Sequence, residues 1–411
     1  MKKIVLFLLL FALGGCTSFG RGVAEAFLDK EKEENVKNCE IHGSEFQGID
    51  YALNRGETVK ILMIHGVGSH IPGYSTRLRE NLAKHLGLNV FSKHPKNITL
   101  INPKDKKTPI GNLRAIKMSS EDHQKNVIFY ELTWSEITDK AKKILSYDIS
   151  GEYKHKRAAF NNAMKAFLDD TIPDPMIYLL DSEGMILNST KQATCWVIGK
   201  RWDELEETQA KVCDVSSIKQ IDDMNKENIV FITHSLGSRI LLDSISDVVQ
   251  EVSQAELKTK QAQLIVDELK NKKFTIFMMA NQIPLLQIGK KRPPVHNKIS
   301  SYCKPKGKFY NKRVFSKVDI IAFSDPNDLL SYSIPQSFVD DYMDSRMCPN
   351  LTNISVNVAD EISAFGVGVV NPMTAHTGYD NDETVIQLMS YGLSSCSEKD
   401  LRMRCRFIRL E

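Results

Sequence analysis

The sequence predicts an α/β fold with a mostly parallel central sheet and helices on both faces. Apolar runs of strand length alternate with stretches in which apolar residues recur at helical spacing. Glycine, serine, aspartate and histidine follow these runs, and in such sheets function gathers at the carboxyl ends of the strands. The expected strands are residues 59–64, 126–132, 228–232, 274–280, 318–323 and, as the last of the chain, 354–358.

Length, composition and charge limit the possible classes of protein. A chain of 411 residues exceeds the roughly 250 of a single α/β domain, which predicts one core with insertions or two domains. Its 42% hydrophobic and 26% charged residues are ordinary for a soluble globular protein. The formal net charge of +3 includes Lys2 and Lys3, so the chain without its leader carries +1. This charge argues against a nucleic-acid binder.

The N-terminus has the layout of an export signal. Lys2 and Lys3 precede the apolar run 4–12, which is too short to span a bilayer comfortably. Leu13-Gly14-Gly15-Cys16 follows and resembles the lipobox of bacterial lipoproteins. The resemblance implies a signal peptide at 1–15 and a lipidated Cys16, in which each buried methylene contributes about 0.8 kcal/mol to anchoring. The alternative is an ordinary signal peptide that contains a cysteine by chance.

The lipoprotein resemblance also implies a location and a disulfide-permissive compartment. Thr17 after the cysteine resembles outer-membrane sorting in Gram-negative bacteria, facing the periplasm. Residues 16–57 include the charged run 28–34 and are expected to form a tether. Seven cysteines remain besides Cys16, and an odd number cannot all pair internally. Two pairs are near in sequence, without fixing the connectivity: Cys195 with Cys213 and Cys396 with Cys405.

The first core strand, 59–64, runs into His65-Gly66-Val67-Gly68. Two glycines flanking one residue let the main chain approach a substrate closely. His65 and His70 are expected to order this loop, and an ordinary glycine-rich turn is the alternative. Residues 95–125 are polar and lysine-rich and are expected to be a surface excursion. Residues 135–225 contain helical patterns without a clear long strand.

The strand at 228–232 leads through Thr233-His234-Ser235-Leu236-Gly237 into a helix. This turn is close to the nucleophile elbow G-x-S-x-G, whose small flanking residues let strand and helix approach. Gly237 fits the motif and Thr233 departs from it. An ordinary Ser-Leu-Gly turn is the alternative.

A serine nucleophile needs a histidine base and a carboxylate that orients the histidine. Downstream of Ser235 lie His296, in a basic proline-rich loop, and His376, after the last expected strand. His376 also follows the two candidate acids, Asp325 and Asp328, so it is the preferred base. Asp328 begins an apolar run that ends in proline and is preferred as the acid; Asp325 is the alternative, with a turn-capping role otherwise.

Over residues 58–385 this order of motifs resembles the α/β-hydrolase superfamily. The resemblance implies a domain over 58–411 with a helical cap or lid insertion at about 135–225; ordinary helical core is the alternative interpretation of that insertion. It implies a lipase- or esterase-like serine hydrolase that cleaves carboxylic esters through an acyl-enzyme, without metal or cofactor. Ser235, His376 and Asp328 would form the triad. The main-chain amides of Leu236 and Val67 would form the oxyanion hole, to which Gly68 could add a further amide.

The same resemblance leaves other functions open. A thioesterase, an amidase or an acyltransferase uses the same constellation, and a catalytically silent hydrolase fold could serve as an envelope binding protein. The expected partners are an ester or lipid substrate and the membrane through Cys16, with no nucleic acid. The sequence contains no C-x-x-C or H-E-x-x-H pattern, so it gives no zinc signature.

Overall fold

A computed structural model of the protein describes residues 39–92, 94–150, 157–181, 184–213, 227–254, 260–364, 367–393 and 404–408. The expected signal peptide, the expected lipidation site Cys16, and Cys396 lie outside these residues. Among the described helices, none is long and apolar enough to cross a bilayer.

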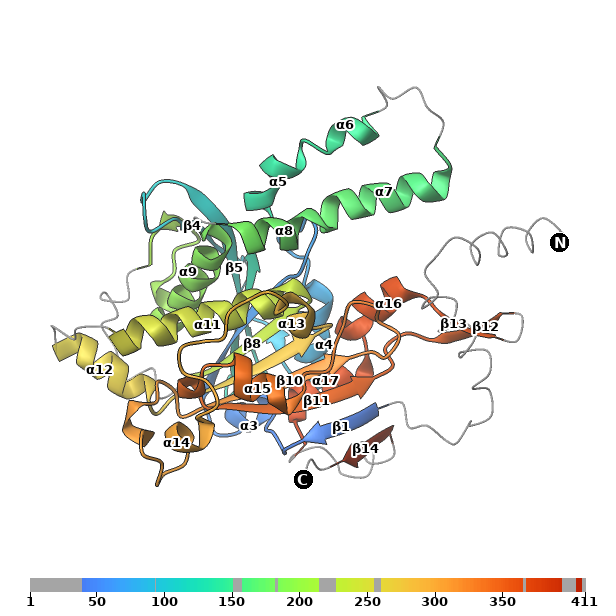
Figure 1. Cartoon of the computed structure of the whole chain (residues 1–411). Helices are drawn as coiled ribbons and strands as arrows, with labels where there is room; N and C mark the ends of the chain where they lie inside the picture. The colour runs from blue at the N-terminus through green and yellow to red at the C-terminus, as the bar shows by residue number, and fades with distance from the viewer. Residues whose placement is uncertain are drawn as a thin grey trace.

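The predicted α/β architecture with a large, mostly parallel sheet is confirmed (Figure 1). Within the described residues, twelve strands form the central sheet, and six neighbours at its centre are parallel. In spatial order the six are β6 (Asn126–Thr133), β2 (Thr58–Ile64), β8 (Glu227–His234), β9 (Lys273–Met279), β10 (Lys317–Ser324) and β11 (Pro349–Val356). Each predicted strand lies within or overlaps one of them, because apolar runs without alternation are typical of strands buried on both faces.

Helices cover both faces of the sheet, and each face has its own apolar core. One core contains apolar side chains of α9 (Met185–Gly199), α11 (Leu236–Gln254), α12 (Lys260–Leu269) and α15 (Gln336–Tyr342). The other contains those of α3 (Ile49–Leu53), α4 (Thr76–Leu86) and α17 (Glu383–Tyr391). Shorter elements connect strands: α13 (Ile283–Leu286), α14 (Ile299–Cys303), α16 (Pro372–Thr377), and the 3₁₀ helices η1 (Trp202–Glu204), η3 (Tyr310–Lys312), η4 (Ser345–Met347) and η5 (Gly378–Asp380).

The expected surface excursion at 95–125 is wrong. Its residues form β4 (Lys96–Ile101) and β5 (Pro109–Ser119), which extend the sheet from β6 and are joined by β7 (Thr208–Lys211) and β3 (Asn89–Val90). Ile98, Leu100, Leu113 and Ala115 are fully buried. Polar residues alternate with these apolar ones, so the segment lacks the continuous apolar run by which the central strands are predicted.

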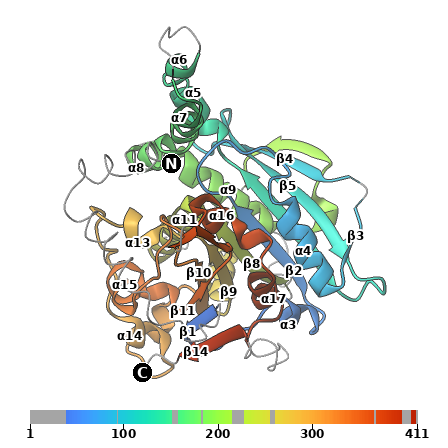
Figure 2. The same ribbon diagram turned by 90° about the vertical axis from the view of Figure 1, so that its right-hand side faces the viewer.

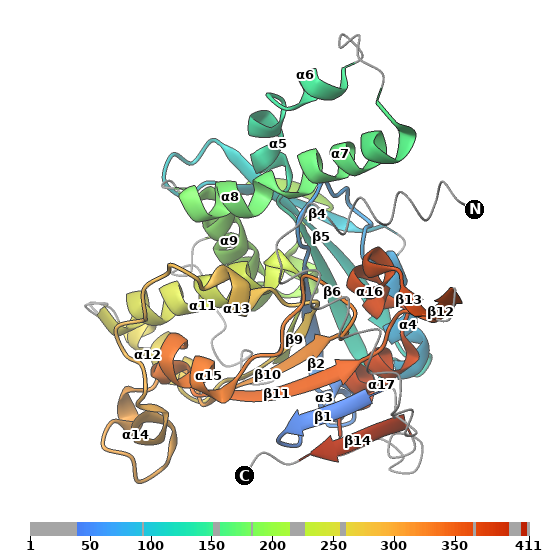
Figure 3. The same ribbon diagram turned by 45° about the vertical axis from the view of Figure 1, so that its right-hand side comes forward.

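The folded domain begins before residue 58, so the expected tether over 16–57 is too long. β1 (Cys39–Gly43) pairs antiparallel with β11, and β14 (Cys405–Ile408) pairs with β1 at the edge of the sheet (Figure 3). The strand expected last is therefore followed by β14 and by the hairpin of β12 (Glu361–Ala364) and β13 (Val367–Val370). Disulfides join Cys39 to Cys405, Cys195 to Cys213 and Cys303 to Cys348. Cys405 thus pairs with Cys39 rather than with Cys396.

The segment at 135–225 divides into two parts. α5 (Glu136–Lys142), α6 (Ser146–Ile149), α7 (Ala159–Thr171) and α8 (Pro173–Leu180) form an arm; α5, α6 and α7 project beyond the sheet in Figure 1. The later part belongs to the body, because α9 packs on β4 and β5 while β7 pairs with β4. We call α5–α8 the arm below.

Candidate active site

Ser235 lies at the turn between β8 and α11 in a sterically strained backbone conformation. Its φ is 54°, in the left-handed region that non-glycine residues rarely adopt. The Ser235 amide donates a hydrogen bond of 2.9 Å to the carbonyl oxygen of Met279 on the neighbouring strand, which fixes the turn. A strained serine between a buried strand and a helix is the geometry of a nucleophile elbow.

Two glycines permit the close approach of β2 to this turn. A Cβ on Gly66 would lie 2.7 Å from the Cβ of Ser235, closer than such atoms approach. A Cβ on Gly237 would lie 2.6 Å from the carbonyl oxygens of Ile64 and His65. The requirement for small residues therefore falls on Gly66 and Gly237.

Thr233, the departure from the elbow motif, has a structural role. Its side chain is buried, and its hydroxyl lies 2.8 Å from that of Ser238 on the first turn of α11. It also donates a longer hydrogen bond, 3.5 Å, to the carbonyl oxygen of Phe277. A threonine at this position links the strand to the helix instead of leaving room between them.

The preferred acid, base and serine lie in one hydrogen-bonded chain. The hydroxyl oxygen of Ser235 is 3.2 Å from Nε2 of His376, and Nδ1 of His376 is 2.9 Å from both carboxylate oxygens of Asp328. The carboxylate only accepts, so Nδ1 carries the proton and Nε2 is free to accept from the serine. All three residues are buried, and Ser235 exposes only 1% of its surface. The Ser235 hydroxyl is therefore almost closed off from solvent in this conformation.

The two candidate acids have different partners. Asp325 accepts hydrogen bonds from the amides of Val358 at 2.7 Å and Asn327 at 2.7 Å, and its own amide donates to the Tyr379 hydroxyl at 2.7 Å. It fastens the loop after β10 to the one after β11. Of these two carboxylates, Asp328 is the one that contacts His376. The other downstream histidine, His296, makes a 2.8 Å hydrogen bond with the carbonyl oxygen of Pro293.

His234 contacts the base, although no pattern in the sequence singles it out. Its Nε2 donates a 2.8 Å hydrogen bond to the carbonyl oxygen of His376, and the two rings lie 5.0 Å apart. Desolvation, followed by the neighbouring His376, lowers the pKa of His234 to about 3, so the ring stays neutral. The only sequence signal was its place beside Ser235 in the elbow.

His65 orders the loop after β2, as expected. Its ring stacks between those of His70 and Trp134, with centroid distances of 4.1 and 4.7 Å. Its Nε2 accepts the Trp134 amide at 3.2 Å, so Nδ1 donates to the Gly66 carbonyl oxygen at 2.8 Å. Burial, more than the charge of His70, lowers the pKa of His65 well below its usual value.

The two amides expected to bind an oxyanion lie on the elements that flank the serine. Leu236 is the first residue of α11, and the first amides of a helix have no intrahelical acceptor. Val67 follows Gly66 in the loop after β2. The amide of Gly68 is already engaged, because it donates to a carboxylate oxygen of Asp174 at 2.6 Å. Gly68 is thus not a second donor from this loop in the present conformation.

A cluster of charges from the arm, here called the clamp, holds this loop. Asp174 binds the Gly68 amide, and Asp170 accepts from both the amide and the hydroxyl of Ser69, at 2.9 and 2.7 Å. Lys142 lies between the two carboxylates, 2.8 Å from Asp174 and 3.3 Å from Asp170. Lys142 and Asp174 are buried. The clamp couples the arm to the backbone beside Val67.

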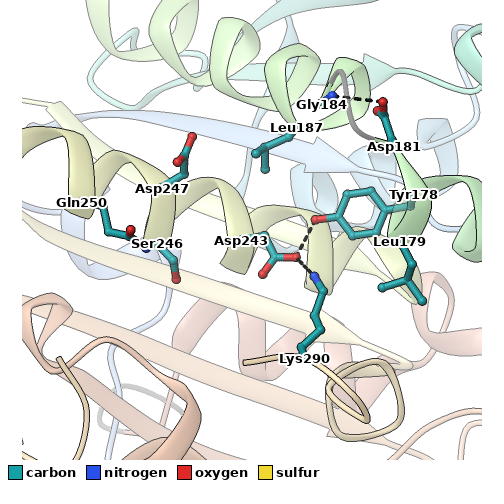
Figure 4. Close-up of a pocket in the computed structure, with 10 residues that line it drawn as sticks. All are labelled: Tyr178, Leu179, Asp181, Gly184, Leu187, Asp243, Ser246, Asp247, Gln250 and Lys290. Atoms are coloured by element: carbon teal, nitrogen blue, oxygen red, sulfur yellow. Dashed lines mark hydrogen bonds and ion pairs between the residues drawn. The ribbon is translucent and has the colours of Figure 1, made fainter. Parts of the chain in front are cut away.

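A separate pocket of about 320 Å³ lies between the arm, α9 and α11 (Figure 4). Asp243 accepts hydrogen bonds there from the Tyr178 hydroxyl, Lys290 and Arg239. None of the three triad residues lines this pocket. Its polar groups attach α8 and the loop after α13 to α11.

Comparisons of the chain with protein-family models, curated proteins and solved structures found no match. The function must therefore be inferred from the geometry of the chain itself.

Proposed function

We propose that this chain is a lipase- or esterase-like serine hydrolase of the α/β-hydrolase type, anchored by lipid at Cys16 in the bacterial envelope. The hydrogen-bonded chain from Asp328 through His376 to Ser235 carries the proposal. The order of the six parallel strands supports it. The serine follows β8, the acid follows β10 and the histidine follows β11, in the Ser-acid-His order of that superfamily.

The reaction begins with attack of the Ser235 hydroxyl oxygen on the ester carbonyl. Nε2 of His376 takes the hydroxyl proton, and Asp328 stabilises the imidazolium through Nδ1. The amides of Leu236 and Val67 bind the developing oxyanion, an interaction whose loss costs about 3 kcal/mol of transition-state stabilisation. The imidazolium then protonates the departing alkoxide, which leaves an acyl-enzyme.

The second half of the reaction uses the same groups. His376 removes a proton from water, the hydroxide oxygen attacks the acyl carbonyl, and the proton returns to Ser235 as the carboxylic acid leaves. No metal or cofactor enters either half. The arm acts as the cap that shapes the acyl site, because its clamp is attached to the loop that carries Val67.

A fluorophosphonate probe tests the reaction class, since it phosphonylates activated serines. We expect the wild type to be labelled, and the labelling to be lost in Ser235→Ala and His376→Ala. Ser253→Ala serves as the matched control: its hydroxyl is on the same helix and bonds the Val249 carbonyl oxygen, away from the triad. A folded wild type that stays unlabelled would contradict the enzyme proposal and favour a silent binding protein.

Two further measurements define the bond and the anchor. Matched ester, thioester and amide substrates identify the reaction, and faster turnover of the thioester or amide would replace the ester assignment. Metabolic labelling with a fatty-acid analogue is expected to mark the wild type and to fail in Cys16→Ser. Labelling that persists in Cys16→Ser would contradict the anchor.

A further inference from the structure

We propose that the carboxyl edge of the sheet, with the arm, is a membrane-binding face that docks on the phospholipid bilayer holding the anchor. This inference rests on the proposed function and the proposed anchor. It names the substrate class: the ester is carried by a lipid of that bilayer rather than by a water-soluble molecule.

Exposed apolar side chains lie in the connections that follow four of the parallel strands. Ile71 follows β2, Ile288 follows β9, Leu329 follows β10 and Met373 follows β11. The first three are 74 to 79% exposed, and Met373 is 43% exposed. Parallel strands bring their carboxyl ends to the same edge, so the four side chains belong to connections that leave the sheet at the end that holds Ser235. Figure 2 shows two elements of these connections, α13 and α16, on the side of the sheet that faces the arm. Clustered exposure of large apolar residues marks an interaction surface.

The arm adds to this surface. Ile144 and Leu180 are at least 80% exposed, and Met176 is more than half exposed. The exposed lysines Lys140 and Lys143 lie beside Ile144 in the chain. Apolar side chains with neighbouring lysines are typical of segments that lie in a bilayer interface, because the hydrocarbon enters the lipid while the ammonium groups remain among the phosphates.

The opposite edge of the sheet has a different surface. The connections that enter β2, β6 and β9 there are residues 54–57, 120–125 and 270–272, and all three consist of polar residues and glycine. None of these residues is among the exposed large hydrophobics. These three polar connections thus differ from the connections at the carboxyl edge that carry exposed apolar side chains.

The described domain begins at Cys39, at the same edge of the sheet as Ser235. Cys39 pairs with Val356, the last residue of β11, and a disulfide joins Cys39 to Cys405. From Cys16 to Cys39 the chain advances 23 residues, which reach at most about 80 Å when fully extended. The lipid thus holds this edge within reach of the bilayer, and tethering makes even weak insertion of apolar side chains effective. A lipid ester could then approach the buried Ser235 without crossing water.

Hydrogen exchange on the purified lipidated chain tests the orientation without using activity. The chain carrying Ser235→Ala is compared in detergent and in phosphatidylethanolamine–phosphatidylglycerol vesicles. We expect slower exchange in vesicles for residues 69–73, 140–147 and 285–292, and unchanged exchange for 54–57, 120–125 and 270–272. Protection at the polar connections, equal protection at both edges, or protection that depends on protein density rather than on lipid would overturn the proposal; the last outcome indicates contact with a second copy.

Turnover measurements provide the second part of the test. Ile288→Asp, outside the arm and the triad, is expected to lower hydrolysis of a long-chain ester in vesicles about tenfold while leaving a short soluble ester within about twofold. The matched control is Val90→Asp, an apolar side chain on β3 that is 55% exposed. Equal turnover by the two variants in vesicles would overturn the docking proposal. A wild type that is not labelled by the fluorophosphonate would instead contradict the proposed function. The hydrogen-exchange comparison would still test the docking.

Discussion

The two edges of the central sheet are made by the same strands but carry different chemistry. At the amino edge the connection before β2 contains a left-handed residue, Gly56, whose φ is 75° and whose Cβ position is open. At the carboxyl edge the left-handed residue after β8 is Ser235, whose Cβ lies close against Gly66. Before β2, glycine takes the conformation that the backbone demands. After β8, a serine takes it at the cost of strain and presents a hydroxyl group.

Charge also differs between the edges. At the amino edge, buried Lys60 forms a 2.6 Å ion pair with Glu227, and Lys273 pairs with Asp319 at 2.9 Å. At the carboxyl edge, burial lowers the pKa values of His65 and His234, so these rings stay neutral and order the loops by hydrogen bonds. The amino edge holds paired charges that stabilise the sheet. Next to Ser235, the carboxyl edge holds these neutral rings and the carboxylate of Asp328, which is bonded to His376, while the paired charges of the clamp come from the arm.

The largest effect is expected from Asp328→Asn. An amide in place of the carboxylate presents a donor to Nδ1 and favours the wrong histidine tautomer, so we expect kcat to fall about 10⁴-fold. Asp325→Asn is the matched change three residues earlier, and it removes an acceptor from the loop amides instead. It should lower kcat less than about tenfold while reducing stability by about 1–3 kcal/mol. Ester turnover and urea unfolding of both variants measure these effects; comparable turnover by the two would reject Asp328 as the acid.

Gly66→Ala is expected to have the next largest effect. The added methyl group must move the serine, because it would lie 2.7 Å from the Ser235 Cβ, and such a displacement costs about 100-fold in kcat. Gly56→Ala at the amino edge is the control. It forces a left-handed alanine at a cost of about 1–2 kcal/mol in stability, with turnover unchanged. Similar losses of turnover in both variants would show that general destabilisation, not displacement of the serine, explains the first.

The clamp should have a smaller effect on turnover. Asp174→Asn keeps an acceptor for the Gly68 amide but weakens the pairing with Lys142, which loosens the loop that carries Val67. We expect kcat to fall about tenfold with KM little changed, because the amide acts on the transition state. Asp148→Asn is the matched control, since Asp148 pairs with Arg157 and Lys165 elsewhere on the arm. A change confined to KM would assign the clamp to substrate binding.

The sequence was sufficient for the parallel core of the sheet and for the residues that meet at Ser235. Continuous apolar runs identify strands buried on both faces, and the small residues at Gly66 and Gly237 follow from the close contact at the elbow. The antiparallel part of the sheet was missed. β4 and β5 carry lysine and asparagine between their buried residues, so the propensities of these residue types alone predict a loop.

Long-range partners explain the other misses. Nothing local to Cys39 or Cys405 indicates that residues 366 positions apart form one edge of the sheet. Asp170 and Asp174 look like ordinary charges of an amphipathic helix, and their bonds to the loop after β2 depend on how the arm folds back. Asp325 and Asp328 could not be separated by their local sequence with certainty, because the loop after β11 supplies the amides that bind one of them.

The smallest expected effect concerns stability below neutral pH. Because its pKa is lowered by burial, His65 is neutral in the folded chain, whereas in the unfolded chain it binds a proton below about pH 6.5. Acid therefore favours unfolding, and the free energy of unfolding falls as the pH drops through this value and is unaffected well above it. Between about pH 7 and pH 6 we expect His65 to contribute a loss of about 0.7 kcal/mol. His65→Gln removes this proton uptake, so urea unfolding should show a weaker pH dependence by that amount, with His42→Gln, on β1, as the control. An unchanged pH dependence in His65→Gln would mean that the ring is already protonated in the fold, and the loop after β2 would then hold a charged histidine instead of a neutral one.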